Sequence, residues 1–136
     1  MMKYKILVVD DNEDICFVLK SYFEETGYSV QVAENAFEAF SLLEKEEYDM
    51  VILDYNLGYG PTGLDIFYKI KEMNLPVKIL MSTSEMDDKS LNMAIERENI
   101  RVLYKPFRMN SLCREVNNIL ETERDRNFTE EFCCVI

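Results

Sequence analysis

The chain contains no histidine among its 136 residues. This absence excludes histidine-based zinc sites, Ser-His-Asp triads and histidine general bases. It also means that the chain cannot itself be the phosphohistidine partner in a phosphotransfer relay.

Long apolar runs are missing too. No run approaches the roughly 20 residues that a helix needs to cross a bilayer. Residues 1–5 precede only a short apolar run that ends in two aspartates, which is not the pattern of a signal peptide. The cysteines lack the spacing of a disulfide framework; they are Cys16, Cys113, Cys133 and Cys134. We therefore expect a cytoplasmic, reduced protein without a membrane segment.

Positive charge is scarce, with 15 lysines and arginines against 26 aspartates and glutamates, for a net charge of −11. Such a surface repels nucleic acid phosphates, so we expect no nucleic acid partner and instead a basic protein surface or a cation. The length and the 48% hydrophobic content are typical of a globular chain with one usable core. We expect residues 1–122 to form the domain and residues 123–136 a C-terminal tail.

Apolar runs alternate with helical patterns five times along the chain. Strict alternation of this kind predicts an α/β fold, with a parallel sheet covered by helices on both faces. The expected strands are residues 5–9, 28–33 and 49–54, a fourth that follows Pro76 and ends at Thr83, and residues 100–104. The expected helices lie between Asn12 and Gly27, from the Asn35 cap to Leu43, and at 63–73, 86–97 and 108–122.

Polar groups follow four of these strands where the apolar runs end. Asp10 and Asp11 close the first run, Asp54 the third, Thr83 the fourth and Lys105 the fifth. The carboxyl ends of parallel strands share one edge, where open sheets bind ligands. Three carboxylates within about 4–6 Å repel each other by several kcal/mol per pair at an effective dielectric near 20. Lys105 and a bound Mg²⁺ would together neutralise this cluster.

A carboxylate at the end of the most apolar strand can act as a nucleophile. Asp54 can attack a phosphorus atom and form an acyl phosphate, while the cation and Lys105 offset charge on the phosphoryl oxygens. The Thr83 hydroxyl can donate to one of those oxygens. Acids at strand ends also serve as solvated helix caps. If Asp10 and Asp11 are considered without the other residues, this explanation is sufficient for them. The matching positions of Asp54, Thr83 and Lys105 favour one shared site.

These residues carry a family resemblance. The sequence resembles the receiver domain of two-component response regulators, similar to the chemotaxis regulators, over about residues 3–122. The resemblance implies a flavodoxin-like, doubly wound fold of five parallel strands in the order 2-1-3-4-5 with five helices. The matching residues are Asp10-Asp11, Asp54, Thr83-Ser84 and Lys105-Pro106-Phe107.

The resemblance also implies roles at the acidic site. Asp54 would accept a phosphoryl group from a histidine kinase or a histidine phosphotransfer protein. Asp11 and Asp54 would ligate Mg²⁺ through their carboxylates, and the Asn56 backbone carbonyl would be a third ligand. Asp10 would act mostly through water.

A second set of implied roles concerns the switch. Lys105 would pair with the phosphoryl group and Thr83 would drive the change; Ser82 is a competing hydroxyl, but the spacing to Lys105 favours Thr83. Asn56 and Glu85 would tune the phosphate lifetime, although both are equally consistent with polar loop residues. The fourth helix, fifth strand and fifth helix would form the surface for a downstream protein partner or a homodimer.

The sequence departs from the family at two places. Gly58 stands where the family usually has a proline, and the loop to Gly63 is one residue longer. Val102 occupies the usual position of the switch aromatic, and the aromatic residue is instead Tyr104. We therefore expect an altered loop path and altered coupling between the switch hydroxyl and the aromatic ring.

Three hypotheses follow. The first is a stand-alone, phosphorylated receiver, a signalling module and not an enzyme, since little chain remains for an output domain. The second is a pseudo-receiver that binds partners without phosphorylation. The third is a haloacid-dehalogenase-type phosphatase, which would need an acid at Asn56 to protonate the leaving group. The Cys133-Cys134-Val135-Ile136 segment matches a prenylation motif, for which we favour chance.

Overall fold

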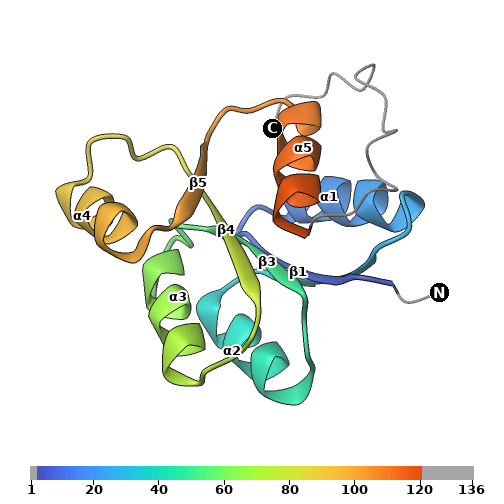
Figure 1. Ribbon diagram of the computed structural model, residues 1–136, viewed down its shortest axis with the longest axis horizontal. Coiled ribbons are helices and arrows are strands. Elements are labelled where there is room, and N and C mark those ends of the chain that lie inside the picture. Colours follow the sequence, from blue (N-terminus) through green and yellow to red (C-terminus); the bar gives the residue numbers. More distant parts are fainter. Residues whose placement is uncertain (1–2, 121–136) are drawn as a thin grey trace.

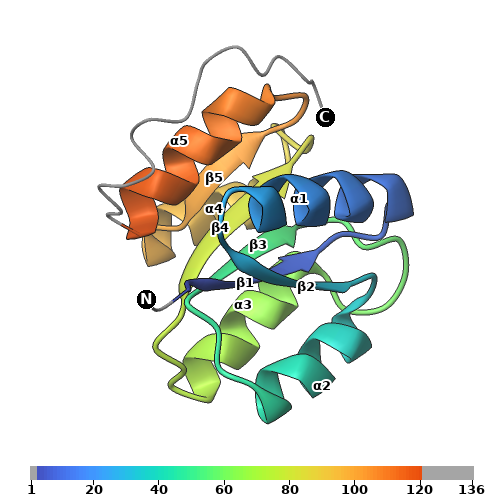
Figure 2. The same ribbon diagram turned by 90° about the vertical axis from the view of Figure 1, so that its right-hand side faces the viewer.

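The computed structural model describes residues 3–120. It contains a five-stranded parallel sheet in the order β2-β1-β3-β4-β5 (Figures 1 and 2). The strands are β1 (Lys5–Val9), β2 (Ser29–Ala33), β3 (Met50–Asp54), β4 (Lys78–Thr83) and β5 (Arg101–Tyr104). The helices are α1 (Glu13–Glu25), α2 (Ala36–Lys45), α3 (Gly63–Glu72), α4 (Lys89–Glu98) and α5 (Met109–Leu120). The predicted doubly wound fold is confirmed.

Helices cover both faces of the sheet, which explains the continuous apolar runs in its central strands. One apolar cluster lies between the sheet and α1 and α5, and a second lies between the sheet and α2, α3 and α4. Figure 2 shows α1 and α5 on one side of the strands and α2 and α3 on the other. Every residue of β3 is buried, so its last residue, Asp54, lies in an environment that is unusual for a carboxylate.

The predicted helix caps are largely correct. The side chain of Asn12 accepts a hydrogen bond from the Ile15 amide at the start of α1, and Asn35 does the same for Glu38 in α2. The fourth helix begins at Lys89, so the expectation of a start at 86 is wrong. Its cap is Asp88, whose carboxylate accepts from the Leu91 amide at 2.9 Å.

The end of the last predicted helix, at 122, lies outside the described residues, as does the predicted tail with Cys133 and Cys134. Within the described range, Cys16 and Cys113 are buried free thiols. Burial, and next the Asp10 carboxylate, raises the pKa of Cys16 to about 11, so its thiol stays protonated at neutral pH. Between residues 3 and 120, no helix combines the length and the apolar character needed to cross a membrane.

Candidate functional site

The acidic site lies at the carboxyl edge of the sheet, where β1 and β3 run side by side. Val9 pairs with Leu53 in the sheet, so the residues that follow, Asp10 and Asp54, end at the same level. Both are buried, at 3% and 7% exposure. The next acid, Asp11, is exposed. Carboxylate oxygens of the three acids lie within 4.8 Å of one another.

One lysine serves both buried acids. The Nζ atom of Lys105 donates to Asp10 Oδ2 at 3.1 Å and to Asp54 Oδ2 at 3.4 Å. The other carboxylate oxygen of Asp10 accepts from the Asn12 amide at 2.9 Å. Asp10 is therefore satisfied by the protein, whereas Asp54 has only the long contact with Lys105 among the described residues.

The charge at this edge is unbalanced, and the pKa of Asp54 reflects this. Burial, and next the carboxylate of Asp10, raises the pKa of Asp54 to about 7, although Lys105 offsets part of the effect. For Lys105, burial lowers the pKa, but the carboxylates of Asp54 and Asp10 outweigh this and raise it overall. Oxygen ligands with excess negative charge suit a small, hard divalent cation. The residues present therefore fit Mg²⁺.

The loop after β3 contains Asn56, which is exposed. Its side-chain oxygen accepts from the Gly58 amide at 3.0 Å and turns the chain. Gly58 has a φ of 85°, which proline cannot adopt because its ring fixes φ near −65°. A Cβ atom on Gly58 would lie 3.3 Å from Asp11 Oδ2. The Gly58 backbone therefore lies next to an acid of the site, in a conformation that proline could not adopt.

Gly63, the first residue of α3, packs against the backbone at the end of β3. A Cβ atom there would lie 2.4 Å from the Asp54 carbonyl oxygen, so no other residue fits without displacement of the backbone. The Gly63 amide donates to the Tyr55 carbonyl at 2.8 Å. The start of α3 is thus joined directly to the end of β3.

Two hydroxyl groups lie at the end of β4, and both are buried. They point to opposite faces of the sheet because they are adjacent on a strand. Ser82 lines a small cavity together with Asp10 and Lys105. Thr83 Oγ1 accepts from the Glu85 amide at 2.9 Å, so it is engaged with the loop that leads to α4. Glu85 itself is exposed.

The fifth strand carries the residues that replace the usual switch aromatic. Val102 is partly buried and packs against the cluster beneath α2, α3 and α4. Tyr104 pairs with Thr83 in the sheet and is 38% exposed. An aromatic ring is therefore present beside the end of β4, two residues further along β5 than expected for the family.

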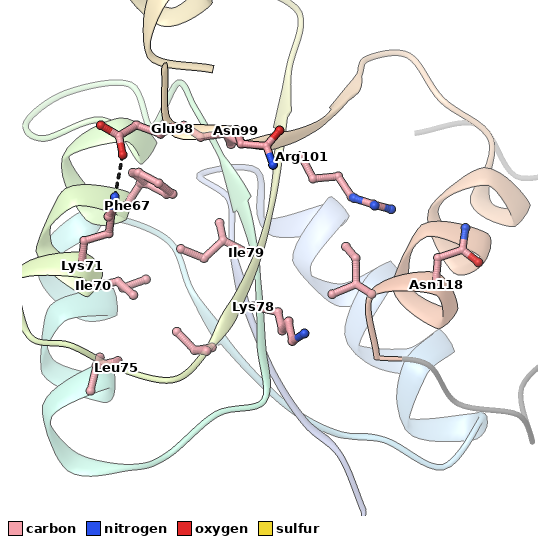
Figure 3. Close-up of a pocket in the computed structure, with 13 residues that line it drawn as sticks. Phe67, Ile70, Lys71, Leu75, Lys78, Ile79, Glu98, Asn99, Arg101 and Asn118 are labelled. Carbon is pink, nitrogen blue, oxygen red and sulfur yellow. Dashed lines mark hydrogen bonds and ion pairs between the residues drawn. The ribbon is translucent and has the colours of Figure 1, made fainter. Parts of the chain in front are cut away.

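Sequence reasoning missed a set of contacts that attach α4. The Tyr55 hydroxyl donates to Asp88 Oδ2 at 3.2 Å. At the other end of the helix, Arg97 donates to the Tyr68 hydroxyl at 2.6 Å. Lys71 also pairs with Glu98 at 2.6 Å, as Figure 3 shows. No sequence signal reveals these pairs, because each joins residues that are distant in the chain.

A cavity of about 490 Å³ lies at the opposite end of the sheet (Figure 3). It is lined by residues of α3, the amino end of β4, the end of α4 and α5, including Phe67, Ile70, Ile79 and Asn118. None of the three acids lines it. The cavity is therefore separate from the acidic site.

The family model for the response regulator receiver domain matches residues 6–117. The chain belongs to the response regulator receiver domain family. This receiver is 30% identical over 119 residues to the regulatory protein VanRB of Enterococcus faecalis, covering 88% of this chain and 53% of that protein. It is 31% identical over 115 residues to the response regulator SaeR of Staphylococcus epidermidis, covering 85% of this chain and 49% of that protein.

The chain spans about half the length of these curated relatives. The expectation of a stand-alone receiver therefore stays a prediction. Receiver domains are signalling phosphoacceptors and not enzymes in the usual sense, which favours the two receiver hypotheses over the phosphatase.

Solved structures agree with the family and the fold. The response regulator protein TrrA of Thermotoga maritima, in complex with Mg(2+)-BeF, superposes with a TM-score of 0.73 at 30% identity, covering 87% of this chain and 99% of that chain. A two-component response regulator of Clostridium difficile gives a TM-score of 0.78 at 29% identity, covering 93% and 100%. The Vibrio cholerae chemotaxis protein CheY4, at 24% identity with a TM-score of 0.77, covers 87% and 99% and shows the shared fold.

Proposed function

We propose that this receiver accepts a phosphoryl group on Asp54 and signals the modification to a protein partner. The observation that carries the proposal is the setting of Asp54. Its carboxylate lies at the end of a fully buried strand, with carboxylate oxygens of Asp10 and Asp11 within 4.8 Å and Lys105 Nζ at 3.4 Å. A nucleophilic oxygen, a cluster of metal ligands and a fixed cation are the parts that phosphoryl transfer requires.

Mg²⁺ is the cofactor that fits this set of oxygens. Asp11 and Asp54 would hold it through their carboxylates, the Asn56 backbone carbonyl would be a third ligand, and Asp10 would act through water. When bound, the ion offsets carboxylate charge and polarises the phosphoryl oxygens. The Mg(2+)-BeF complex of TrrA supports the proposal, because that protein shares 30% of its aligned residues with this chain.

The phosphoryl donor would be a phosphohistidine on a histidine kinase or a histidine phosphotransfer protein. An ionised Asp54 oxygen attacks the phosphorus, and the phosphorus–nitrogen bond breaks as the new phosphorus–oxygen bond forms. The ammonium group of Lys105 stabilises the charge on the transferred group. Water would later hydrolyse the acyl phosphate. Asn56 and Glu85, both exposed in adjoining loops, would control its access.

The modification would act as a switch. A phosphoryl group adds about −1.5 to −2 charge at this edge. Thr83 would turn from the Glu85 amide toward the new oxygens, and the surface of α4, β5 and α5 would change with it. That surface would bind a downstream protein or a second copy of the chain in the cytoplasm. Nucleic acid is not the proposed partner of this domain, because the chain carries a net charge of −11.

A pseudo-receiver is the second candidate, favoured by Val102 at the switch position and by the bond between Thr83 and the Glu85 amide. It would bind its partner equally well with or without phosphate. Comparison of partner binding by the wild type and by Asp54→Ala separates the two, because only the phosphorylated switch depends on Asp54.

Incubation with acetyl phosphate and Mg²⁺, followed by intact-protein mass spectrometry, tests phosphoacceptance directly. The wild type is expected to gain one phosphate, and Asp54→Asn none. Asp87→Asn is the matched control, because Asp87 is an exposed acid in the loop before α4, and it should be modified like the wild type. A wild-type protein that stays unmodified would overturn the proposal.

A further inference from the structure

Helix α4 is attached to the domain differently from α5. It buries two side chains, Leu91 and Ala94. By contrast, α5 buries Met109, Leu112, Cys113, Val116 and Leu120. The apolar surface that α4 places against the sheet is therefore small, and its position depends more on polar contacts. In the described chain, its side-chain contacts with α3 and the end of β3 involve residues 55–71, the segment that directly follows Asp54.

The contact at the start of α4 differs from the two at its end. Tyr55, next to the proposed phosphoacceptor, donates its hydroxyl to Asp88, and both residues are partly buried. At neutral pH a tyrosine hydroxyl carries its proton, so Tyr55 is the donor in this pair. Arg97 and Lys71, which make the contacts at the end, are exposed and screened by water. A partly buried hydrogen bond to a carboxylate is the stronger kind.

Tyr55 is a rigid support for this contact. Its amide donates to the Ser82 carbonyl of β4 at 2.9 Å, and its carbonyl accepts from Gly63 of α3 at 2.8 Å. The backbone is therefore fixed on both sides. The Tyr55 side chain therefore extends from a fixed backbone next to Asp54, and its hydroxyl reaches Asp88 from there.

Asp88 also sets where α4 begins. One of its carboxylate oxygens binds the Tyr55 hydroxyl, and the other caps the helix through the Leu91 amide. Leu91 is one of the two buried side chains of α4. The Tyr55 contact thus fixes the first turn of α4 and its apolar anchor together.

The segment 84–88 connects the switch hydroxyl to this contact and is held at both ends. At its start, the Glu85 amide donates to Thr83 Oγ1; at its end, Asp88 accepts from Tyr55. A turn of Thr83 toward a group on Asp54 gives up the first bond and displaces the segment. The second bond resists that displacement.

We propose that the hydrogen bond from Tyr55 to Asp88 is a latch, which holds α4 in its unphosphorylated position and opens when Asp54 is modified. The inference rests on the proposed function of Asp54. An interaction present in one state of a two-state protein favours that state, and so lowers the apparent affinity for any ligand that selects the other. Loss of the latch should therefore raise the affinity of the Asp54 site for a phosphoryl group or a mimic of it.

The test is a titration of the metal-loaded protein with beryllium fluoride, a phosphoryl mimic, with the amide NMR signals of α4 as readout. Tyr55→Phe removes the hydroxyl and keeps the ring, and should bind the mimic about five- to tenfold more tightly than the wild type. Asp88→Ser keeps an oxygen that can cap α4 but removes the carboxylate, and should give a similar gain. The double variant should show no further gain, because both changes open one contact.

Tyr68→Phe is the matched control. It removes the hydroxyl that contacts Arg97 at the other end of α4 and should bind the mimic like the wild type. Equal affinities for Tyr55→Phe and the wild type overturn the latch, and so does an equal gain in Tyr68→Phe, which indicates general loosening of α4. A wild type that does not bind the mimic overturns the proposed function instead, so the two failures are distinguishable.

Discussion

The two ends of the sheet carry charge in opposite ways. At the amino end, Lys5 of β1 pairs with Glu46, and both side chains are about one-third exposed, at 32% each. At the carboxyl end, one partly buried lysine serves the two buried acids Asp10 and Asp54, with Asp11 close by. The amino-end pair is matched in charge and partly exposed, whereas the carboxyl end has more acids than cations and buries two of those acids.

The pKa values of two carboxyl groups express this contrast. The hydrogen bond from Lys5, and next that from Gln31, lowers the pKa of Glu46. Burial and then Asp10 raise that of Asp54 to about 7. The first arrangement stabilises the ionised acid, and the second destabilises it. A fold retains such a cost where function requires it, here at the edge that would receive a cation and a phosphoryl group.

Removal of the shared cation should have the largest combined effect, on phosphorylation and on stability. Lys105→Met leaves the acids without a positive partner, so the rate of phosphorylation by acetyl phosphate should fall by at least about 100-fold. The free energy of unfolding near neutral pH should also fall, by about 3 kcal/mol, as measured by urea denaturation. Lys78→Met, at the exposed amino end of β4, should change neither quantity; an equal loss there would contradict the contrast between the two ends.

Neutralisation of the acid itself should stabilise the metal-free protein, and the gain should depend on pH. In the folded chain the pKa of Asp54 is raised from 3.8 to about 7. The protonated acid thus stabilises the fold below about pH 4, and this contribution is lost as the pH rises through about 7. Above that pH, Asp54→Asn should exceed the wild type by up to about 4 kcal/mol in free energy of unfolding, and the gap should close toward pH 4. Urea denaturation of both proteins, in the presence of a chelator and at several pH values, measures this difference in free energy of unfolding. A difference that grows as the pH falls would contradict the raised pKa of Asp54.

Magnesium should supply the charge that the carboxyl end lacks. At about ten times its dissociation constant, Mg²⁺ should raise the free energy of unfolding by about 1.4 kcal/mol. Thermal unfolding with Mg²⁺ or with a chelator measures this gain. Asp49→Asn, which changes an exposed acid at the amino end, should keep the response, and Asp54→Asn should weaken it. If Mg²⁺ does not change the thermal unfolding of the wild type, a metal site at these acids is excluded.

Loss of the amino-end pair should have the smallest effect. Glu46→Gln removes the charge that faces Lys5, but both side chains are partly exposed and the pair is screened by water. The melting temperature should change by less than about 3 °C, and phosphorylation should be unaffected. A larger shift would show that the two ends depend on charge to a similar degree.

The sequence was enough to predict the fold, because each buried strand is an apolar run between recognisable caps. The predicted start of the fourth helix, at residue 86, is too early. Met86, Asp87 and Asp88 together are typical of an acidic first turn, but the last of these acids lies outside the helix and caps it. Single residues in a run of similar acids do not reveal which carboxylate folds back onto the backbone.

The site was predictable at the level of its acids and its lysine, since parallel strands bring their carboxyl ends together. Their unequal burial was not, because Asp10 and Asp11 are chemically identical neighbours beyond the end of β1, where the path of the loop decides which of them is buried. The contact of Tyr55 with Asp88 and the close approach of Gly63 were also beyond prediction. Each depends on the packing of segments that are distant in the sequence.

The contact between Gly63 and the carbonyl of Asp54 sets a rule for rebuilding this receiver as a biosensor. A methyl group at that position would lie 2.4 Å from the carbonyl oxygen. Reporter peptides inserted into residues 56–62 should therefore leave the final glycine in place. Without this glycine, the insertion would push α3 away from β3, and the reporter would no longer follow the phosphorylation of Asp54.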